Sequence, residues 1–133
     1  PWRLAIFTVG LFLLVMAIAE HGLTDVLTAA LGSEPITNAL VSGAASNVVN
    51  NLPAYLAIEP AIPAGDTTRL FAVLLGTNAG PLILLWGSLA TLLWRERCKA
   101  RGVHISALRF AAIGLGGVPL VLLASTAALM IST

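Results

Sequence analysis

Charged residues are scarce in this sequence. Only 10% of its 133 residues are Asp, Glu, Lys or Arg, whereas a soluble domain typically carries about 25%. A soluble protein of this length needs a polar shell around its core, and a chain that is 58% hydrophobic has too few polar residues to make one. The composition excludes an ordinary soluble enzyme and a disordered chain, and it predicts an integral membrane protein whose partner is the lipid bilayer.

A strong net charge is also missing. Seven Lys and Arg residues oppose six Asp and Glu residues, which leaves a net charge of +1. Such a chain has no field that could attract a polyanion, so we expect no nucleic-acid partner. Cys98 is the single cysteine, which excludes an internal disulfide and a zinc site built from paired cysteines.

The N-terminal region lacks the features of a secretory signal peptide. No charged region precedes a short apolar stretch with a small-residue cleavage site. The chain begins with Pro1 rather than Met. We therefore expect a fragment of a longer protein, from which an N-terminal repeat is absent.

Long hydrophobic runs are what the sequence does contain. About 20 residues are needed to cross a bilayer as a helix, and three windows without Asp, Glu, Lys or Arg reach this length: 35–58, 70–94 and 110–133. A shorter window, 4–19, extends to residue 31. The runs are continuous rather than alternating, which favours an all-α fold over a barrel. We predict a helix over 4–31, a polar, interrupted segment over 35–60, a broken helix over 68–95 and a helix over 106–131.

The basic residues indicate an orientation. Five of the seven lie at positions 95, 97, 99, 101 and 109, in or beside one short loop. Basic short loops remain in the cytoplasm, so the 95–109 loop is expected there and the C-terminus outside, in a multi-pass protein of the plasma membrane. Trp86 and Trp94 fit an aromatic belt on the cytoplasmic side, although Trp86 lies deep in its window.

The 35–58 window is too polar for an ordinary span. Asn47, Asn50 and Asn51 lie near its centre, and Pro53 follows them. Three amides facing lipid without partners would be costly, and the proline disfavours helix immediately before it. Two interpretations remain: a broken span, or a re-entrant hairpin with its tip at 46–51. A hairpin would place Arg3 on the same side as the basic loop, and a span would place it on the opposite side.

The 70–94 window has a break of its own. Gly76, Gly80 and Pro81 surround the pair Thr77 and Asn78, and we expect the helix to unwind there near the middle of the membrane. Irregular backbone at that depth is tolerated where it lines a cavity or is buried in protein. Paired interruptions of this kind point to the binding site of a transporter.

The breaks predict a site made of amides and backbone groups. Neither window contains a full charge. The N-terminus of a half-helix attracts an anion, and carbonyl oxygens near Asn47 and Asn78 suit Na⁺. The predicted substrate-binding residues are Ser46, Asn47, Asn50, Asn51, Gly76, Thr77, Asn78 and Gly80. The alternative is structural: helix–helix hydrogen bonds for the Asn residues, a helix cap for Ser46, and close packing for the glycines. No nucleophile–base pair or phosphate loop is visible, so we expect no enzyme and no cofactor.

Two motifs resemble a known family. Residues 46–53 read SNVVNNLP, which resembles the SNxxNNxP hairpin motif of arsenite permeases and their relatives in the ion transporter superfamily. Residues 76–81 read GTNAGP, and GSLATLLW follows at 87–94, like the second break of that family. The resemblance covers nearly the whole chain. It implies the C-terminal half of an inverted-repeat transporter, with a hairpin entering from outside and an unwound helix ending in the cytoplasm.

The resemblance implies a function but leaves the substrate open. The first expectation is efflux of arsenite or antimonite by alternating access, coupled to H⁺. The alternatives are a Na⁺-coupled importer of dicarboxylates or tricarboxylates such as citrate, and a truncated membrane subunit that no longer transports. Many relatives carry Thr-Pro where this chain has Leu84-Leu85, and this departure puts the identity of the small inorganic or organic anion in doubt. An N-terminal repeat, a second subunit or a homodimer would complete the cavity.

Overall fold

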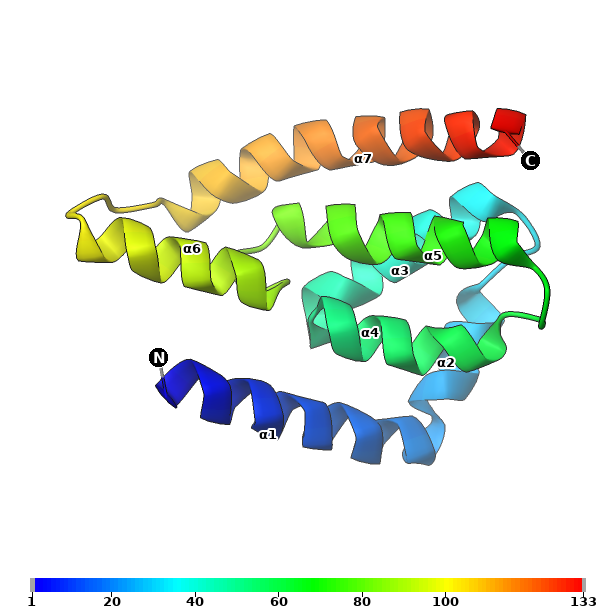
Figure 1. Ribbon diagram of the computed structural model, residues 1–133, viewed down its shortest axis with the longest axis horizontal. Coiled ribbons are helices and arrows are strands. Elements are labelled where there is room, and N and C mark those ends of the chain that lie inside the picture. Colours follow the sequence, from blue (N-terminus) through cyan, green and yellow to red (C-terminus); the bar gives the residue numbers. More distant parts are fainter. Residues whose placement is uncertain (1, 133) are drawn as a thin grey trace.

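The computed structural model describes residues 2–132, and those residues form helices and their connections without any strand (Figure 1). The predicted all-α fold is therefore confirmed. The first hydrophobic run forms α1 (Trp2–Ile18) and α2 (Thr24–Ala30), joined by the short turn η1 (Ala19–Leu23). Gly22 has φ +103°, a value that glycine adopts without steric cost, and it allows the kink between the two helices.

The second window forms two antiparallel helices. Helix α3 (Pro35–Val49) is followed by α4 (Asn51–Ile58), and Asn50 separates them with φ 76° and ψ 154°. Proline suits the first turn of α3, because the first amides of a helix have no helical partner. The outer ends of both helices lie at the same end of the molecule, and the turn between them lies near its middle (Figure 1).

The third window also forms two helices with a connection that is not α-helical. Helix α5 (Thr67–Ala79) follows the short turn η2 (Glu59–Ala61) and is capped by Asp66, whose side chain accepts a hydrogen bond from the Arg69 amide at 3.1 Å. The turn η3 (Gly80–Leu82) and residues 83–88 lead to α6 (Leu89–Ala100). Ser88 caps α6 by accepting from the Thr91 amide at 3.1 Å.

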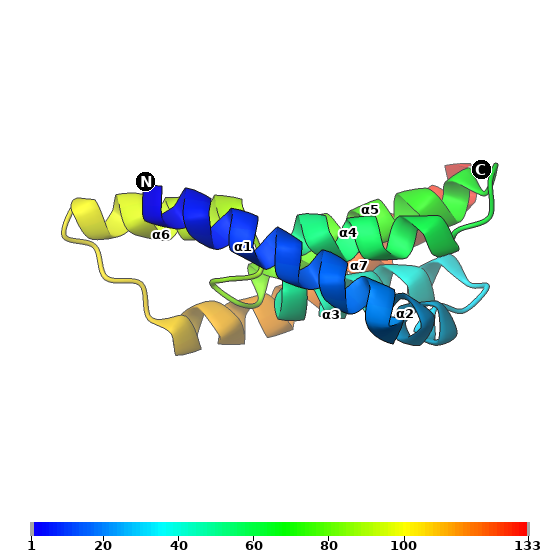
Figure 2. The same cartoon turned by 90° about the horizontal axis from the view of Figure 1, so that it is seen from below.

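The last helix, α7 (Ala107–Ser132), packs along α5 and α3. Two stretches are long and apolar enough to cross a membrane: Trp2–Ala30, which includes the kink, and Ala107–Ser132. The N-terminus and the α6–α7 connection lie at one end of the molecule, whereas the C-terminus and the α4–α5 connection lie at the other (Figures 1 and 2).

The distribution of side chains is the reverse of that in a soluble protein. Asn38, Ser42 and Ser46 are fully buried, while Ile113 and Leu120 are 76% and 67% exposed. Polar groups between helices with apolar groups on the outside are typical of helices packed within lipid. The exposed apolar surface of α1 and α7 therefore supports a membrane protein.

The contact between α3 and α5 depends on glycine. A Cβ atom added to Gly76 would clash with the Ser42 hydroxyl and the Ala39 carbonyl, and one added to Gly80 would clash with the backbone of Gly43. Small residues at such positions let two helix backbones approach closely in a membrane. This approach brings the end of α5 to the turn between α3 and α4.

Candidate functional site

The turn of the α3–α4 hairpin is bonded to the break between α5 and α6. Asn47 makes the central contacts. Its Nδ2 atom donates to the carbonyls of Gly80 at 2.7 Å and Gly43 at 2.9 Å, and its Oδ1 atom accepts from the Leu84 amide at 3.0 Å. Both Nδ2 protons and the amide oxygen are thus used within the protein. Asn47 holds the two interrupted segments together.

Three further hydrogen bonds join the same segments. The Trp86 indole Nε1 donates to the Asn47 carbonyl at 2.8 Å, and Asn50 Nδ2 donates to the Trp86 carbonyl at 3.0 Å. The Asn51 amide donates to the Gly87 carbonyl at 2.9 Å. Residues 47–51 and 80–87 therefore form one connected unit, the tip–break junction.

Asn50 has an unusual backbone conformation in this junction. Its φ of 76° and ψ of 154° fall in a region that is essentially restricted to glycine. Such a conformation costs of order 1–3 kcal/mol and persists where the surroundings impose it, often at functional sites. Two hydrogen bonds supply that constraint: one from the Asn50 side chain to the Trp86 carbonyl, and one from the Asn51 amide to the Gly87 carbonyl.

Two predicted residues keep polar groups available. The Asn51 side chain is half-buried and makes no hydrogen bond to residues 2–132. Asn78 is exposed, and its Nδ2 atom donates to the Leu74 carbonyl one turn earlier at 2.7 Å. Amides of this kind offer donors and acceptors to a ligand.

The other predicted residues lie inside helix contacts. Ser46 is fully buried and its hydroxyl donates to the Gly43 carbonyl at 2.8 Å. Thr77 is 2% exposed and its hydroxyl donates to the Val73 carbonyl at 3.0 Å. Gly76 and Gly80 provide the close approach of α5 to α3. These four residues shape the junction and present no open polar side chain.

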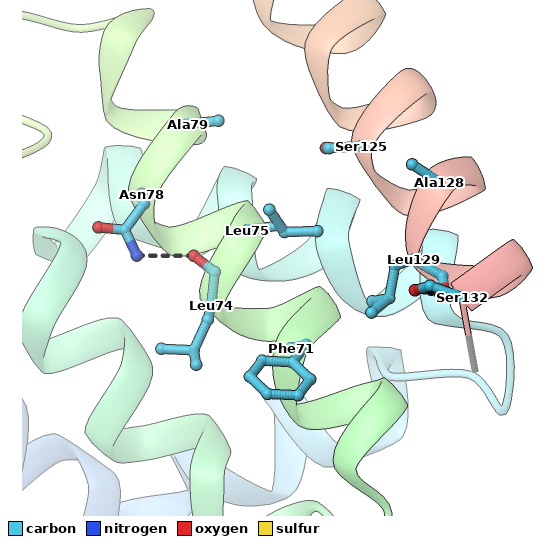
Figure 3. A pocket seen from close by; sticks show the side chains of 9 residues that line it. All are labelled: Phe71, Leu74, Leu75, Asn78, Ala79, Ser125, Ala128, Leu129 and Ser132. Atoms are coloured by element: carbon cyan, nitrogen blue, oxygen red, sulfur yellow. Dashed lines mark hydrogen bonds between the residues drawn. The ribbon is translucent and has the colours of Figure 1, made fainter.

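Asn78 borders a groove between α5 and α7 (Figure 3). The groove has a volume of about 860 Å³ and a mostly apolar lining that includes Phe71, Leu75 and Leu129. The Asn78 amide points away from α7, on the same side of α5 as Leu74 (Figure 3). Within residues 2–132, no hydrogen bond connects Asn78 with the hairpin.

Amide and backbone groups, rather than charges, make up the junction. No Asp, Glu, Lys or Arg occurs at 35–58 or 70–94. No group of three or more His, Cys, Asp or Glu side chains that could hold a metal ion is present in the part of the chain that the structure describes. The arrangement suits recognition of a small hydroxylated molecule by hydrogen bonds.

The sequence of this chain matches a family of known membrane proteins. The model of the family described as arsenical pump membrane protein matches residues 1–131. The chain belongs to the arsenical pump membrane protein family. The resemblance inferred from the two motifs is thereby confirmed.

Individual members of the arsenical pump family share between a quarter and a third of their aligned residues with this chain. The chain is 28% identical over 120 residues to the arsenical pump membrane proteins of Escherichia coli (strain K12) and Yersinia enterocolitica. It is 26% identical over 120 residues to the putative arsenical pump membrane protein of Bacillus subtilis (strain 168). These matches cover 80% of this chain but only 27–28% of each relative. No solved structure matches the chain.

Sequence reasoning missed parts of the junction that the family motifs do not emphasise. Trp86 was expected in an aromatic belt, but the structure bonds its indole to the hairpin turn. Outside the junction, Ser42 is buried at the α3–α5 contact, where its hydroxyl donates to the Val73 carbonyl at 3.2 Å, and Asn38 is buried near the start of α3, where its Nδ2 donates to the Glu34 carbonyl at 2.7 Å. The repeat of polar residues at 38, 42 and 46 was the available signal, because residues four apart share one face of a helix.

Proposed function

We propose that this chain forms part of the C-terminal repeat of a secondary transporter that exports arsenite or antimonite by alternating access. The observation that carries the proposal is the tip–break junction in a chain of the arsenical pump membrane protein family. A hairpin turn bonded to an interrupted helix is the arrangement in which transporters bind substrate near the middle of the membrane.

The position of the chain ends supports a re-entrant hairpin. The N-terminus and the α6–α7 connection lie at the same end of the molecule (Figure 1). This is the topology expected when α3 and α4 enter and leave the membrane on the same side, because the hairpin then does not cross the membrane. The basic 95–109 loop would lie in the cytoplasm. The C-terminus and the open end of the hairpin would lie outside the bacterial plasma membrane, with α5, the break and α6 together forming an unwound span.

The open amides give the proposed substrate contacts. Asn51 and Asn78 offer side-chain donors and acceptors, and Asn50 Oδ1 makes no hydrogen bond to residues 2–132. Arsenite carries three hydroxyl groups and is largely uncharged at neutral pH, so it requires hydrogen bonds rather than an opposing full charge. Ser46, Asn47, Gly76, Thr77 and Gly80 would contribute by fixing the shape of the site.

The second half of the cavity would come from outside this chain. The chain spans little more than a quarter of its curated relatives, and an inverted N-terminal repeat in the full-length protein is the proposed complement. A homodimer is the alternative arrangement. We propose H⁺ as the coupling ion, with Na⁺ as the alternative, because Asn47 Oδ1 accepts one hydrogen bond from the Leu84 amide and has a second lone pair.

Transport in everted membrane vesicles tests this function. Vesicles from cells expressing the full-length protein would receive radioactive arsenite or citrate, with a gradient of either H⁺ or Na⁺. Arsenite accumulation driven by the H⁺ gradient is expected. Citrate transport driven by Na⁺ would instead favour the carboxylate alternative, and no transport of either substrate would favour a non-transporting subunit.

Variants of the open amides test the site. Asn51→Ala and Asn78→Ala should each reduce arsenite transport while the amount of protein in the membrane stays unchanged. Ser125→Ala is the matched control, because Ser125 borders the same groove as Asn78 but its hydroxyl is bonded to its own helix at 2.7 Å. Full transport in both Asn variants would show that these amides are not substrate contacts.

A further inference from the structure

Trp86 is hydrogen bonded within the tip–break junction, and the anchoring of a tryptophan at a membrane interface does not require such bonds. It lies in the non-helical segment between η3 and α6 and is 52% exposed. Its indole Nε1 donates to the Asn47 carbonyl at 2.8 Å, and its own carbonyl accepts from Asn50 Nδ2 at 3.0 Å. One residue of the break thus bonds both the last turn of α3 and the residue that separates α3 from α4.

The bond to Asn47 satisfies a group that its helix leaves unpaired. Helix α3 ends at Val49, so the carbonyl of Asn47 is among the last four of the helix, which have no intrahelical partner. Asn50 cannot continue the helix in its conformation with φ 76°. The indole N–H takes the place of the missing amide and caps the helix from a distant part of the chain.

The second bond acts on the strained residue itself. Asn50 adopts a glycine-type backbone conformation, and its side chain is held by the Trp86 carbonyl. The next amide, that of Asn51, is held by the Gly87 carbonyl at 2.9 Å. The direction of the Asn51 side chain therefore depends on the position of the segment 86–87.

We propose that Trp86 is a positioning residue that holds the hairpin turn in the shape required for substrate binding. It acts through Asn47 and Asn50, while the substrate contacts remain those of the open amides. This inference rests on the proposed function for its effect on transport, but the order that Trp86 imposes on the turn is independent of any substrate.

The chain offers a matched control. Trp94 is 44% exposed, and its ring lies 5.9 Å from that of Phe110 between centroids. Its indole makes no hydrogen bond to the described residues. Trp94→Phe therefore changes the same side chain, at similar exposure, without touching the junction.

The kinetic test compares three forms of the full-length protein in proteoliposomes loaded with an H⁺ gradient. Loss of one hydrogen bond that orients a binding group corresponds to about a tenfold change. Trp86→Phe should raise the KM for arsenite by about that factor while Vmax stays within about twofold. Trp94→Phe should leave KM unchanged. An unchanged KM in Trp86→Phe, or an equal rise in both variants, would overturn the proposal.

A second substitution separates the hydrogen bond from the ring. Benzothienylalanine at position 86 retains the two-ring shape of tryptophan but has sulfur in place of the N–H group, so it should fold even if Trp86→Phe does not. The same rise in KM is expected from it. A wild-type KM with this residue would show that the Nε1 hydrogen bond has no positioning role.

Hydrogen exchange distinguishes failure of this inference from failure of the proposed function. In the full-length protein in lipid nanodiscs, without substrate, the amide of Asn51 should exchange slowly. It should exchange at least about tenfold faster in Trp86→Phe and in the benzothienylalanine protein, but not in Trp94→Phe. Slow exchange in all forms would overturn the inference even if arsenite is transported. If the Asn51 amide exchanges faster in the two Trp86 variants but the wild-type protein transports no arsenite, Trp86 still orders the turn, and arsenite is not the substrate.

Discussion

The Asn47 amide nitrogen and the Gly80 carbonyl oxygen are 2.7 Å apart and hydrogen bonded. This contact connects the last turn of α3 with the residue that directly follows α5. Because Asn47 is 8% exposed, the bond is formed away from solvent. Asn47 thus serves the structure of the site, while the neighbouring amides remain available for a ligand.

Removing the Asn47 side chain should therefore lower stability more than removing its neighbour. Asn47→Ala leaves the Leu84 amide without its partner, and an unsatisfied buried donor costs roughly 1–3 kcal/mol. We expect a decrease of about 2 kcal/mol in the free energy of unfolding, measured by denaturant titration of the full-length protein in detergent. Asn51→Ala, whose side chain has no partner in residues 2–132, should change it by less than about 0.5 kcal/mol. Equal losses in both variants would contradict the assignment.

The glycine at the α3–α5 contact should not tolerate even one methyl group. In Gly76→Ala the new Cβ meets the Ala39 carbonyl, which is backbone and cannot move independently. Overpacking of this kind costs about 1–3 kcal/mol, so the melting temperature in detergent should fall. Gly116→Ala is the control, because no atom lies within 4 Å of its added Cβ and alanine favours a helix by about 1 kcal/mol. A melting temperature for Gly76→Ala at or above the wild-type value would refute the close approach.

Asn50 allows strain and bonding to be separated. Asn50→Gly removes the hydrogen bond to Trp86 but permits the backbone conformation with φ 76° and ψ 154°, so the two effects oppose each other. Asn50→Ala loses the bond and keeps the strain. In differential scanning fluorimetry, the melting temperature of Asn50→Gly should be close to or above that of the wild type. The melting temperature of Asn50→Ala should be lower, by an amount that corresponds to about 1 kcal/mol in the free energy of unfolding. Identical melting of the two variants would indicate that Asn50 is not strained.

A buried hydroxyl in α7 offers a stabilising substitution. Thr126 is 1% exposed and its Oγ1 atom has no hydrogen-bond partner among residues 2–132. Thr126→Val keeps the side-chain shape and removes the unpaired group, which should raise the free energy of unfolding by about 1 kcal/mol. Ser125→Ala, next to it, removes a hydroxyl that is bonded to the Val121 carbonyl at 2.7 Å and should not stabilise. A destabilised Thr126→Val protein would mean that the hydroxyl has a partner.

The sequence predicted the helical class, because it depends on composition and on local residues. The exact places of interruption differ: the first break lies at Asn50, three residues before Pro53, and the second begins at Gly80, whereas Thr77 and Asn78, where unwinding was expected, belong to α5. The roles of individual polar residues depended on contacts between segments far apart in the chain. Ser46 and Thr77 carry hydroxyl groups of the kind that can bind a substrate, yet both hydroxyls donate to carbonyls of their own helices. Their burial follows from the α3–α5 approach, which sequence spacing alone does not fix.

The role of Trp86 also depends on a contact between distant segments and could not be predicted from the local sequence. Its place in the part of an apolar window that is nearer the basic loop indicated an interface, since indoles gather there. Its actual partner, the Asn47 carbonyl, lies 39 residues earlier, and no local pattern reveals that pair. The kink at Gly22 was also unforeseen, because an isolated glycine within an apolar run is compatible with a continuous helix.

The tip–break junction has a consequence for biosynthesis. The partners of Asn47 lie 33, 37 and 39 residues further along the chain. During translation the α3–α4 hairpin is therefore complete before the groups that satisfy its turn have left the ribosome. Until then, its amides must remain with water or the insertion machinery, because lipid offers them no partner. The hairpin can settle among its neighbours only after residues 80–87 have emerged, so the polar turn makes the order of synthesis part of how this protein folds.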